Sequence, residues 1–461
     1  MPACSAASRP SSGRGPEPMA VNRSAVEPLP AFGATFANAQ ELLPGPGLRQ
    51  WRRASYDRFV EQGIPTSRAE DWKYTNVVKA ANVPLALAPK AEVGLDAIGP
   101  YLLGGHKARR LIFINGHIVP ELSHVQGLPR GVRAMSLQRA LQNEPERVAQ
   151  TLAIVEDDRA FTALNGAFAG AGAWIELDDG ADAEDPLQLL FLTVGQPSAF
   201  MNHPRIVLRL GAGARLRLIE SHVGIGAGAS LTNLVSQVDL GPGAVLEHDR
   251  VELVTPECTQ IGKAYIRFDH GARLAQTVAT IGGGLVRNET EARILGRGVE
   301  CLLNGLYHAQ GREHVDNLIR VHHMAPASHS DQFYKGVIDG RAHAVFAGKI
   351  IVHQDAQKTN AYQKNDNLLL SDDAEIDTKP ELEIYADDVK CSHGATSGDL
   401  DPTALFYLRS RGLAREVAES VLTFAFAAEV VERFADPTVR RHVRDVAAKR
   451  LPGGPSLEEL V

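Results

Sequence analysis

A short motif recurs along the middle of the chain. Glycine, alanine, a variable residue and leucine follow one another at 213–216, 243–246 and 271–274, and Gly298-Val299-Glu300-Cys301 is a weaker copy. Successive copies are 30, 28 and 27 residues apart. Between them, short runs alternate apolar and polar residues and lack the periodicity of a helix. A repeat of this length without helices is typical of a stacked β architecture.

The segments between the strands narrow the fold class further. From about 186 to 390 no helical crossovers separate the strands, which argues against a doubly wound fold, and the WD and kelch signatures of a propeller are absent. The sequence therefore predicts a mainly β protein whose core is a parallel β-helix, or solenoid. Each coil of a solenoid buries its surface only against its neighbours, so both ends need caps. We expect the flanking helical regions to be those caps.

Four regions are predicted along the chain. Residues 1–30 are rich in Ser, Pro, Gly and Ala and are predicted to be a disordered tail, within which Met19 is an alternative start to Met1. Residues 31–185 form a helical and mixed region, residues 186–395 the parallel β-helix core, and residues 396–461 a C-terminal helical domain. The predicted helices of that last domain cover about 403–411, 414–434 and 438–450, the third being polar.

Composition limits the function classes. The net charge is 48 − 55 = −7, with no run of Lys or Arg, so a nucleic-acid partner is not expected. No apolar stretch is long enough to span a membrane. The cysteines are isolated and contain no C-x-x-C pair, which fits a reducing cytoplasm rather than a disulfide framework; they are Cys4, Cys258, Cys301 and Cys391.

The sequence Lys-Cys-Ser-His-Gly-Ala-Thr-Ser at 390–397 holds the main candidate site. Cys391 and His393 are two residues apart, so on a strand both side chains point to one face. A thiolate beside an imidazole is half of a soft-metal or iron–sulfur site, and the remaining ligands must come from elsewhere. Spacing alone favours a packed structural cysteine over a ligand.

The other motifs say less about function. The chain has no G-x-x-x-x-G-K-[ST] loop, so it is not itself an ATPase of that type. The stretch 224–229 matches G-x-G-x-x-A but precedes strand sequence rather than a helix, so we interpret it as a loop. A group of five histidines could bind a metal, but the favoured interpretation is that strand histidines face solvent or form hydrogen bonds within the solenoid. They are His308, His314, His322, His323 and His329.

Several long motifs, in order, resemble the SufB/SufD family of the SUF iron–sulfur cluster assembly system. They are Tyr-Lys-Gly-Val-Ile-Asp-Gly at 334–340, Ala-Gln-Lys-Thr at 356–359, Asn-Leu-Leu-Leu-Ser at 367–371, Ala-Asp-Asp-Val-Lys-Cys-Ser-His-Gly-Ala-Thr at 386–396 and Leu-Phe-Tyr-Leu-Arg-Ser-Arg-Gly at 405–412. The resemblance covers about 48–435. Within the family the chain resembles SufD more than SufB, because Gly394 stands where SufB-type chains carry Glu. Neither Cys258 nor Cys301 is assigned to the scaffold cysteine of SufB.

The resemblance implies a right-handed β-helix, a SufB-like partner in a heterodimer and a SufC-like ATPase on the C-terminal helices. It also implies a non-catalytic role in iron acquisition and cluster formation, with iron or a transient iron–sulfur cluster shared near His393, where the family's histidine faces SufB. Some family complexes carry a reduced flavin, although no flavin site is visible in this sequence.

The C-terminal helices carry more apolar residues than two short helices can hide, which predicts a partner or interdomain surface. Its residues are Leu405, Phe406, Leu408, Val421, Phe424 and Phe426. Deleting the chain from about 401 onward is expected to leave the β-helix folded.

Two alternatives remain open at this stage. One is a β-helix enzyme acting on a glycan or acyl substrate, which needs a carboxylate or histidine site along an open groove. The other is a SufB-like scaffold that builds the cluster on its own cysteines, for which Cys258 or Cys301 would be essential.

Overall fold

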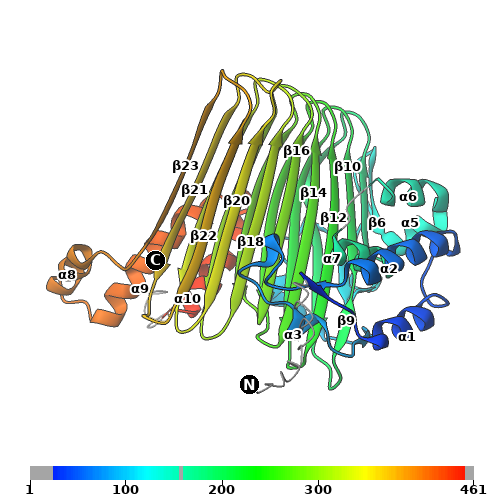
Figure 1. Cartoon of the computed structure of the whole chain (residues 1–461), viewed down its shortest axis with the longest axis horizontal. Helices are drawn as coiled ribbons and strands as arrows, with labels where there is room; N and C mark the ends of the chain where they lie inside the picture. The colour runs from blue at the N-terminus through cyan, green and yellow to red at the C-terminus, as the bar shows by residue number, and fades with distance from the viewer. Residues whose placement is uncertain (1–23, 155–158, 452–461) are drawn as a thin grey trace, which may run out of the picture.

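Parallel strands stacked in two facing sheets make up the middle of the molecule (Figure 1). The computed structural model describes residues 24–154 and 159–451. Sheet I has, in spatial order, β22 (Glu375–Ile384), β20 (His343–Val352), β18 (His314–His323), β16 (Leu285–Ile294), β14 (Cys258–Phe268), β12 (Ser230–Leu240), β10 (Pro204–Leu210), β7 (Ala171–Leu177) and β6 (Val132–Ser136). The short strands β3 (Ala86–Leu87) and β9 (Phe200–Asn202) join it at the side, through β12.

Sheet II contributes the other strand of every coil. Its order is β23 (Lys390–Gly398), β21 (Asn360–Leu369), β19 (His329–Ile338), β17 (Glu300–Ala309), β15 (Arg273–Gly282), β13 (Val245–Val254), β11 (Arg215–Ile225), β8 (Asp182–Val194), β4 (Arg109–Ile114) and β5 (His117–Ile118). Pairing is parallel from β7 and β8 onward, while β6 with β7 and β4 with β5 are antiparallel. The predicted parallel solenoid is confirmed.

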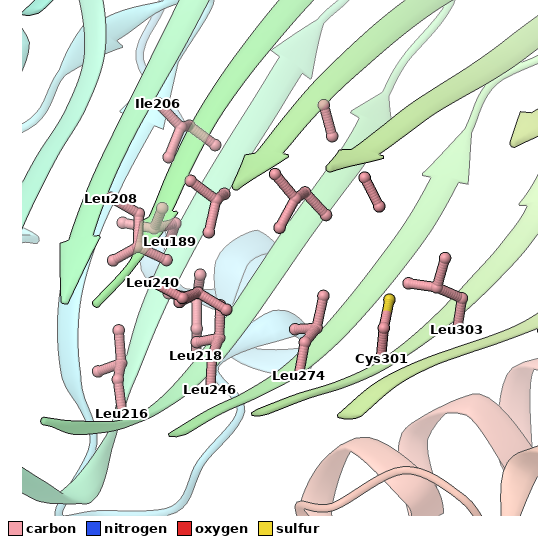
Figure 2. Close-up of a cluster of buried hydrophobic side chains, with 14 of the residues drawn as sticks. Leu189, Ile206, Leu208, Leu216, Leu218, Leu240, Leu246, Leu274, Cys301 and Leu303 are labelled. Carbon is pink, nitrogen blue, oxygen red and sulfur yellow. The ribbon is translucent and has the colours of Figure 1, made fainter. Parts of the chain in front are cut away.

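The repeated motif marks one coil of the solenoid. Its glycines adopt left-handed backbone angles, with φ between 64° and 70°, immediately before the strands of sheet II. Leu216, Leu246, Leu274 and Cys301 then pair in register from strand to strand and form one column of the core (Figure 2). A side chain at the glycine positions would meet no neighbour, so the positive φ is what favours glycine there.

Polar side chains occupy part of the interior. On β11 the inward-facing Leu216 and Leu218 are followed by Glu220 and His222, which are equally buried. The Glu220 carboxylate accepts hydrogen bonds from His222 and His248 and forms an ion pair with Arg250 at 3.4 Å. A buried charge is tolerated only when it is paired, so the residue type at each of these positions depends on the charges beside it.

The N-terminal helices lie on the outer face of sheet I (Figure 1). They are α1 (Pro30–Ala39), α2 (Arg49–Gln62), α5 (Leu137–Asn143), α6 (Pro145–Leu152) and α7 (Ala160–Ala167). Helix α2 ends at Gly63, which has a φ of 70°. Shorter pieces α3 (Val78–Ala81) and α4 (Leu95–Ile98) complete this region.

The C-terminal helices α9 (Arg415–Val431) and α10 (Pro437–Lys449) lie on the outer face of sheet II. Val430, Phe434 and Val443 pack there against Ile219 and Val251. Helix α10 is polar in composition, as predicted, but it is amphipathic and buries one face. Removing residues from 401 onward would uncover this apolar face, and the folding of the solenoid after such a truncation stays a prediction.

Region boundaries shift in two places. Parallel pairing begins well before residue 186, since β3 pairs with β9, β4 with β8 and β7 with β10 in parallel. Residues 1–23 of the predicted tail lie outside the described residues, and at its end β1 (Ala25–Val26) pairs with β2 (Ile64–Pro65).

The caps are also arranged differently from the prediction. Helices cover the two outer faces of the solenoid, yet none covers its last coil, β22 and β23, among the described residues (Figure 1). This coil contains no fully buried residue. The C-terminal end of the solenoid is therefore open.

Candidate functional site

The open end of the solenoid brings the candidate ligands to the surface. Within the described residues, β22 pairs only with β20, and β23 pairs only with β21, so each has one unpaired edge. Cys391 and His393 lie on β23, opposite Ala361 and Gln363 of β21. Ala361 and Gln363 face the interior, so Cys391 and His393 face the same way, as the spacing predicted.

His393 ends a column of buried amides. Gln332, Gln363 and His393 occupy equivalent positions on three successive coils. The Gln363 Nε2 donates a hydrogen bond to the Gln332 Oε1 at 2.8 Å. Both glutamines are buried, whereas His393 is exposed because no further coil covers it.

A rigid polar floor lies beside this column. The Asn365 Nδ2 donates to the Tyr307 hydroxyl at 2.9 Å, which donates in turn to the Asn367 Oδ1 at 2.5 Å. The Asn367 Nδ2 returns a bond to the Asn365 Oδ1 at 2.8 Å. The Gln363 Oε1 and Gln332 Nε2 are buried and lack a partner within the described part of the chain. One hydrogen-bond acceptor and one donor therefore remain unused in the column behind His393.

Cys391 is half-buried rather than freely exposed. It packs against an apolar cluster that includes Ile350, Ala361 and Ala386. Burial raises the pKa of its thiol, against a smaller opposing effect of a backbone hydrogen bond. A protonated thiol is a poor ligand, so Cys391 must lose its proton on metal binding. Its role as a ligand stays a prediction.

The other described cysteines lie far from the open end. Cys301 is fully buried in the apolar core, and burial raises the pKa of its thiol to about 12. Cys258 is also buried, with the hydroxyl groups of Ser230 and Thr255 each 3.0 Å from its sulfur. Both environments suit a packed thiol. Cys4 lies outside the described residues.

The predicted partner surface divides into two parts. Helix α8 (Pro402–Ser410), capped by the Asp401 side chain, projects away from the solenoid and has no buried residue (Figure 1). Phe406 on α8 is 73% exposed. Leu405 and Leu408 of α8, and Val421, Phe424 and Phe426 of α9, are partly buried. The structure thus leaves an apolar surface on α8, whereas α9 also packs on sheet II.

The histidine group does not form one site. His308 and His323 are buried in the interior, and burial lowers the pKa of each ring, to about 3 and about 4. His314, His322 and His329 are partly exposed. Of the stretch 224–229, the first two residues end β11, and 226–229 form the predicted loop that leads into β12.

Sequence reasoning missed the residues that surround His393. Gln363 and Gln332 precede it by one and two coils, and the matching intervals of 30 and 31 residues were the available signal. Without the strand register, such glutamines cannot be told apart from solvent-facing ones. The sequence analysis also missed His343, Glu375 and Asp377 on the outer face of sheet I.

These features define a parallel β-solenoid protein with an open end and a histidine exposed on it. Residues 191–426 match the model for the SufBD core domain of the SUF system for iron–sulfur cluster assembly, and residues 39–189 match the model for the N-terminal region of SufBD proteins. The chain belongs to the SufBD family of iron–sulfur cluster assembly proteins.

Relatives narrow the assignment within that family. The chain is 30% identical over 435 residues to the iron–sulfur cluster assembly protein SufD of Escherichia coli, covering 92% of this chain and 99% of that one. It is 30% identical to a SufBD family protein of Synechocystis, covering 87% and 90%. It is 25% identical to SufD of Bacillus subtilis, covering 64% and 68%. The resemblance found in the sequence is confirmed, and the chain is a SufD homologue. In the described part of the chain, no helix combines the length and apolarity needed to cross a membrane.

Proposed function

We propose that this chain is a non-catalytic SufD-type subunit of a cytoplasmic SufBCD-type scaffold, and that it supports iron acquisition and cluster formation at a SufB interface. The observation that carries the proposal is the open last coil with His393 exposed on it. An unpaired strand edge is a template for a second strand. The edge of β23 is therefore the site at which a SufB-like β-helix pairs.

The two free edges are not equivalent. The backbone N–H groups of Glu375 and Lys390 donate to the carbonyls of Ala342 and Thr359, toward the neighbouring strand of the sheet. Backbone groups alternate in direction along a strand, so the N–H groups of even-numbered residues of β22 and of odd-numbered residues of β23 point to the free edges. Pro380 therefore faces the free edge of β22 and removes one donor from it. The free edge of β23 keeps all of its backbone N–H donors, so it is the better template for pairing with a partner strand.

His393 is the ligand in this proposal. Neutral imidazole binds iron well, and the remaining ligands come from the partner subunit. Iron or a transient cluster is the cargo of the site, with Cys391 as a second, weaker ligand from this chain. A reduced flavin in the complex stays a prediction.

Replacing His393 by alanine tests the ligand role. The exposed ring makes no core contact, so we expect His393→Ala to retain folding and association with SufB-like and SufC-like partners. The iron and acid-labile sulfide content of the anaerobically purified complex should fall by more than half. Cys391→Ser should cause a smaller loss. A His393→Ala complex that assembles clusters at the normal rate would refute the ligand role.

Helix α8 is the proposed contact for a SufC-like ATPase. An exposed aromatic residue on a projecting helix fits a partner's pocket, and truncating such an anchor costs about 2 kcal/mol or more. We expect Phe406→Ala to raise the Kd for the ATPase about 30-fold, with unchanged thermal unfolding. Leu42→Ala is the matched control, since Leu42 is 80% exposed on the N-terminal region. Equal affinity of both variants and the wild type would remove α8 from the interface.

The enzyme alternative is less well supported. A groove of about 860 Å³ runs past Glu176, Arg147 and Arg209 at the rim of sheet I. The Glu176 carboxylate is held by Arg133 and Arg147, with Arg209 at 3.5 Å, so it is committed to ion pairs. Glu176 is therefore not free to act as the acid or base of glycan chemistry, although other carboxylates also line the groove.

A further inference from the structure

A second group of metal-competent side chains lies on the outer face of sheet I. The parallel register places His314, His343 and Glu375 side by side at the starts of β18, β20 and β22. Neighbouring strands are about 4.8 Å apart, so these side chains are immediate neighbours. Asp377 follows Glu375 by two residues and lies on the same face, diagonal to His343.

The ligand atoms converge. The His343 Nε2 lies 2.8 Å from the Asp377 Oδ2, and one ligand atom from each of His343, Glu375 and Asp377 lies within 4.8 Å of the other two. Zinc-type metal–ligand bonds of about 2.0–2.2 Å place two ligands at most about 4.4 Å apart. Small side-chain rotations on a rigid sheet would thus complete the coordination.

The surroundings favour a cation. The ring of His314 lies edge-on to the ring of His343, with 4.7 Å between the ring centroids. The His314 Nε2 lies 2.9 Å from the Thr75 hydroxyl, which donates its proton to Asp316. The nearby cation Arg287 is neutralised by Asp316 and Glu289.

A second nearby cation is neutralised in the same way. Lys379, the next outward-facing residue of β22 after Asp377, is engaged by Glu70 and Glu381. The two carboxylates beside His343 therefore face little unpaired positive charge.

We propose that His343, Glu375 and Asp377 form a binding site for a divalent transition-metal ion. One imidazole and two carboxylates, with positions left for water, suit Fe(II), Mn(II) and Zn(II). Because Glu375 is exposed and β22 is the last strand of its sheet, the ion would exchange readily with solvent. If the proposed function holds, the ion is ferrous iron held on the outer face of sheet I, whereas His393 faces the interior from sheet II.

Mn(II) provides a direct probe, read by electron paramagnetic resonance on the full-length chain. We expect the wild type to bind one Mn(II) that is displaced by anaerobic Fe(II). His343→Ala and Asp377→Asn should each weaken this binding at least about tenfold. Glu375→Gln, at an exposed position, keeps the test valid if either of those variants folds poorly. His270→Ala is the matched control, because His270 is exposed, Asp269 lies beside it at 3.9 Å, and its Nδ1 accepts a hydrogen bond from the Arg297 backbone N–H.

The outcomes separate this site from the proposed function. Absence of Mn(II) binding to the wild type, or equal binding by Glu375→Gln and the wild type, would overturn the site. His393→Ala should bind Mn(II) as the wild type does. If its binding weakened instead, the ion would be held at the open end and the proposal would fail. Normal Mn(II) binding in a chain that supports no cluster assembly would count against the proposed function alone.

Discussion

Replacing Arg250 by methionine is expected to lower the free energy of unfolding by about 3–5 kcal/mol, because it leaves buried carboxylates without their cation. Arg250 lies inside the solenoid between Glu220 and Glu252, with a nitrogen 2.6 Å from Glu252. Glu252 also accepts hydrogen bonds from Gln260 and Thr280. Those bonds orient the carboxylate but do not neutralise it.

The matched control is Arg217→Met. Arg217 pairs with Glu247 at 3.0 Å on the exposed surface, and such pairs contribute about 0–1 kcal/mol. Urea unfolding followed by circular dichroism compares the two variants, and adding Glu252→Gln to Arg250→Met should recover part of the loss. Similar midpoints for Arg250→Met and Arg217→Met would show that the buried charges are solvated or protonated.

The same network predicts how stability depends on pH. Burial raises the pKa of Glu220, but Arg250 and hydrogen bonds from His222 and His248 outweigh it and hold the pKa well below its usual range. The unfolded chain binds a proton near the ordinary glutamate pKa of about 4.3, whereas the folded chain does so only at lower pH. The stabilisation is therefore present above about pH 4.3 and is lost as the pH falls further. The deficit of Arg250→Met should accordingly be largest at neutral pH and shrink in acid.

Much of the architecture could be predicted from the repeat. Each coil needs one tight turn and one inward-facing apolar residue after it. A glycine and an apolar residue, in the positions of Gly213 and Leu216, therefore recur together once per coil. The interior polar residues could not be predicted, because Glu220 and Arg250 alternate with apolar residues in the way that solvent-facing side chains do. Only the register shows that they face inward.

The open end and the second metal-competent group were hidden for related reasons. An edge strand and a central strand have the same alternation, and Pro380 was the one local sign that β22 ends a sheet. His343 and Glu375 are a whole coil apart in the chain, so their contact depends on the register of β20 and β22. For α10 the signal was present, since Val439 and Val443 are four residues apart and define its buried face.

Replacing Ala395 by proline is expected to prevent pairing with a SufB-like β-helix while the solenoid stays folded. Ala395 is an odd-numbered residue of β23, so its N–H faces the free edge and does not bond to β21. Proline is tolerated in an edge strand at such a position but not in a central strand. In the proposed heterodimer β23 would become a central strand, and the proline ring would both remove a donor and keep the partner strand from approaching. A partner carbonyl left unsatisfied costs about 1–3 kcal/mol, to which the steric effect adds.

We therefore expect Ala395→Pro to raise the Kd for the SufB-like partner at least about a hundredfold, or about 2.7 kcal/mol. Gly394→Ala is the matched control, because a β-carbon at this position meets no neighbouring atom and the substitution keeps the backbone N–H of residue 394, which points toward β21. Calorimetric titration gives the two affinities, and thermal unfolding checks that both chains are folded. An Ala395→Pro chain that binds its partner as tightly as Gly394→Ala would show that the heterodimer does not use the edge of β23. The interface would then have to place His393 against its partner through side chains alone, and the open coil would lose its role as the template for assembly.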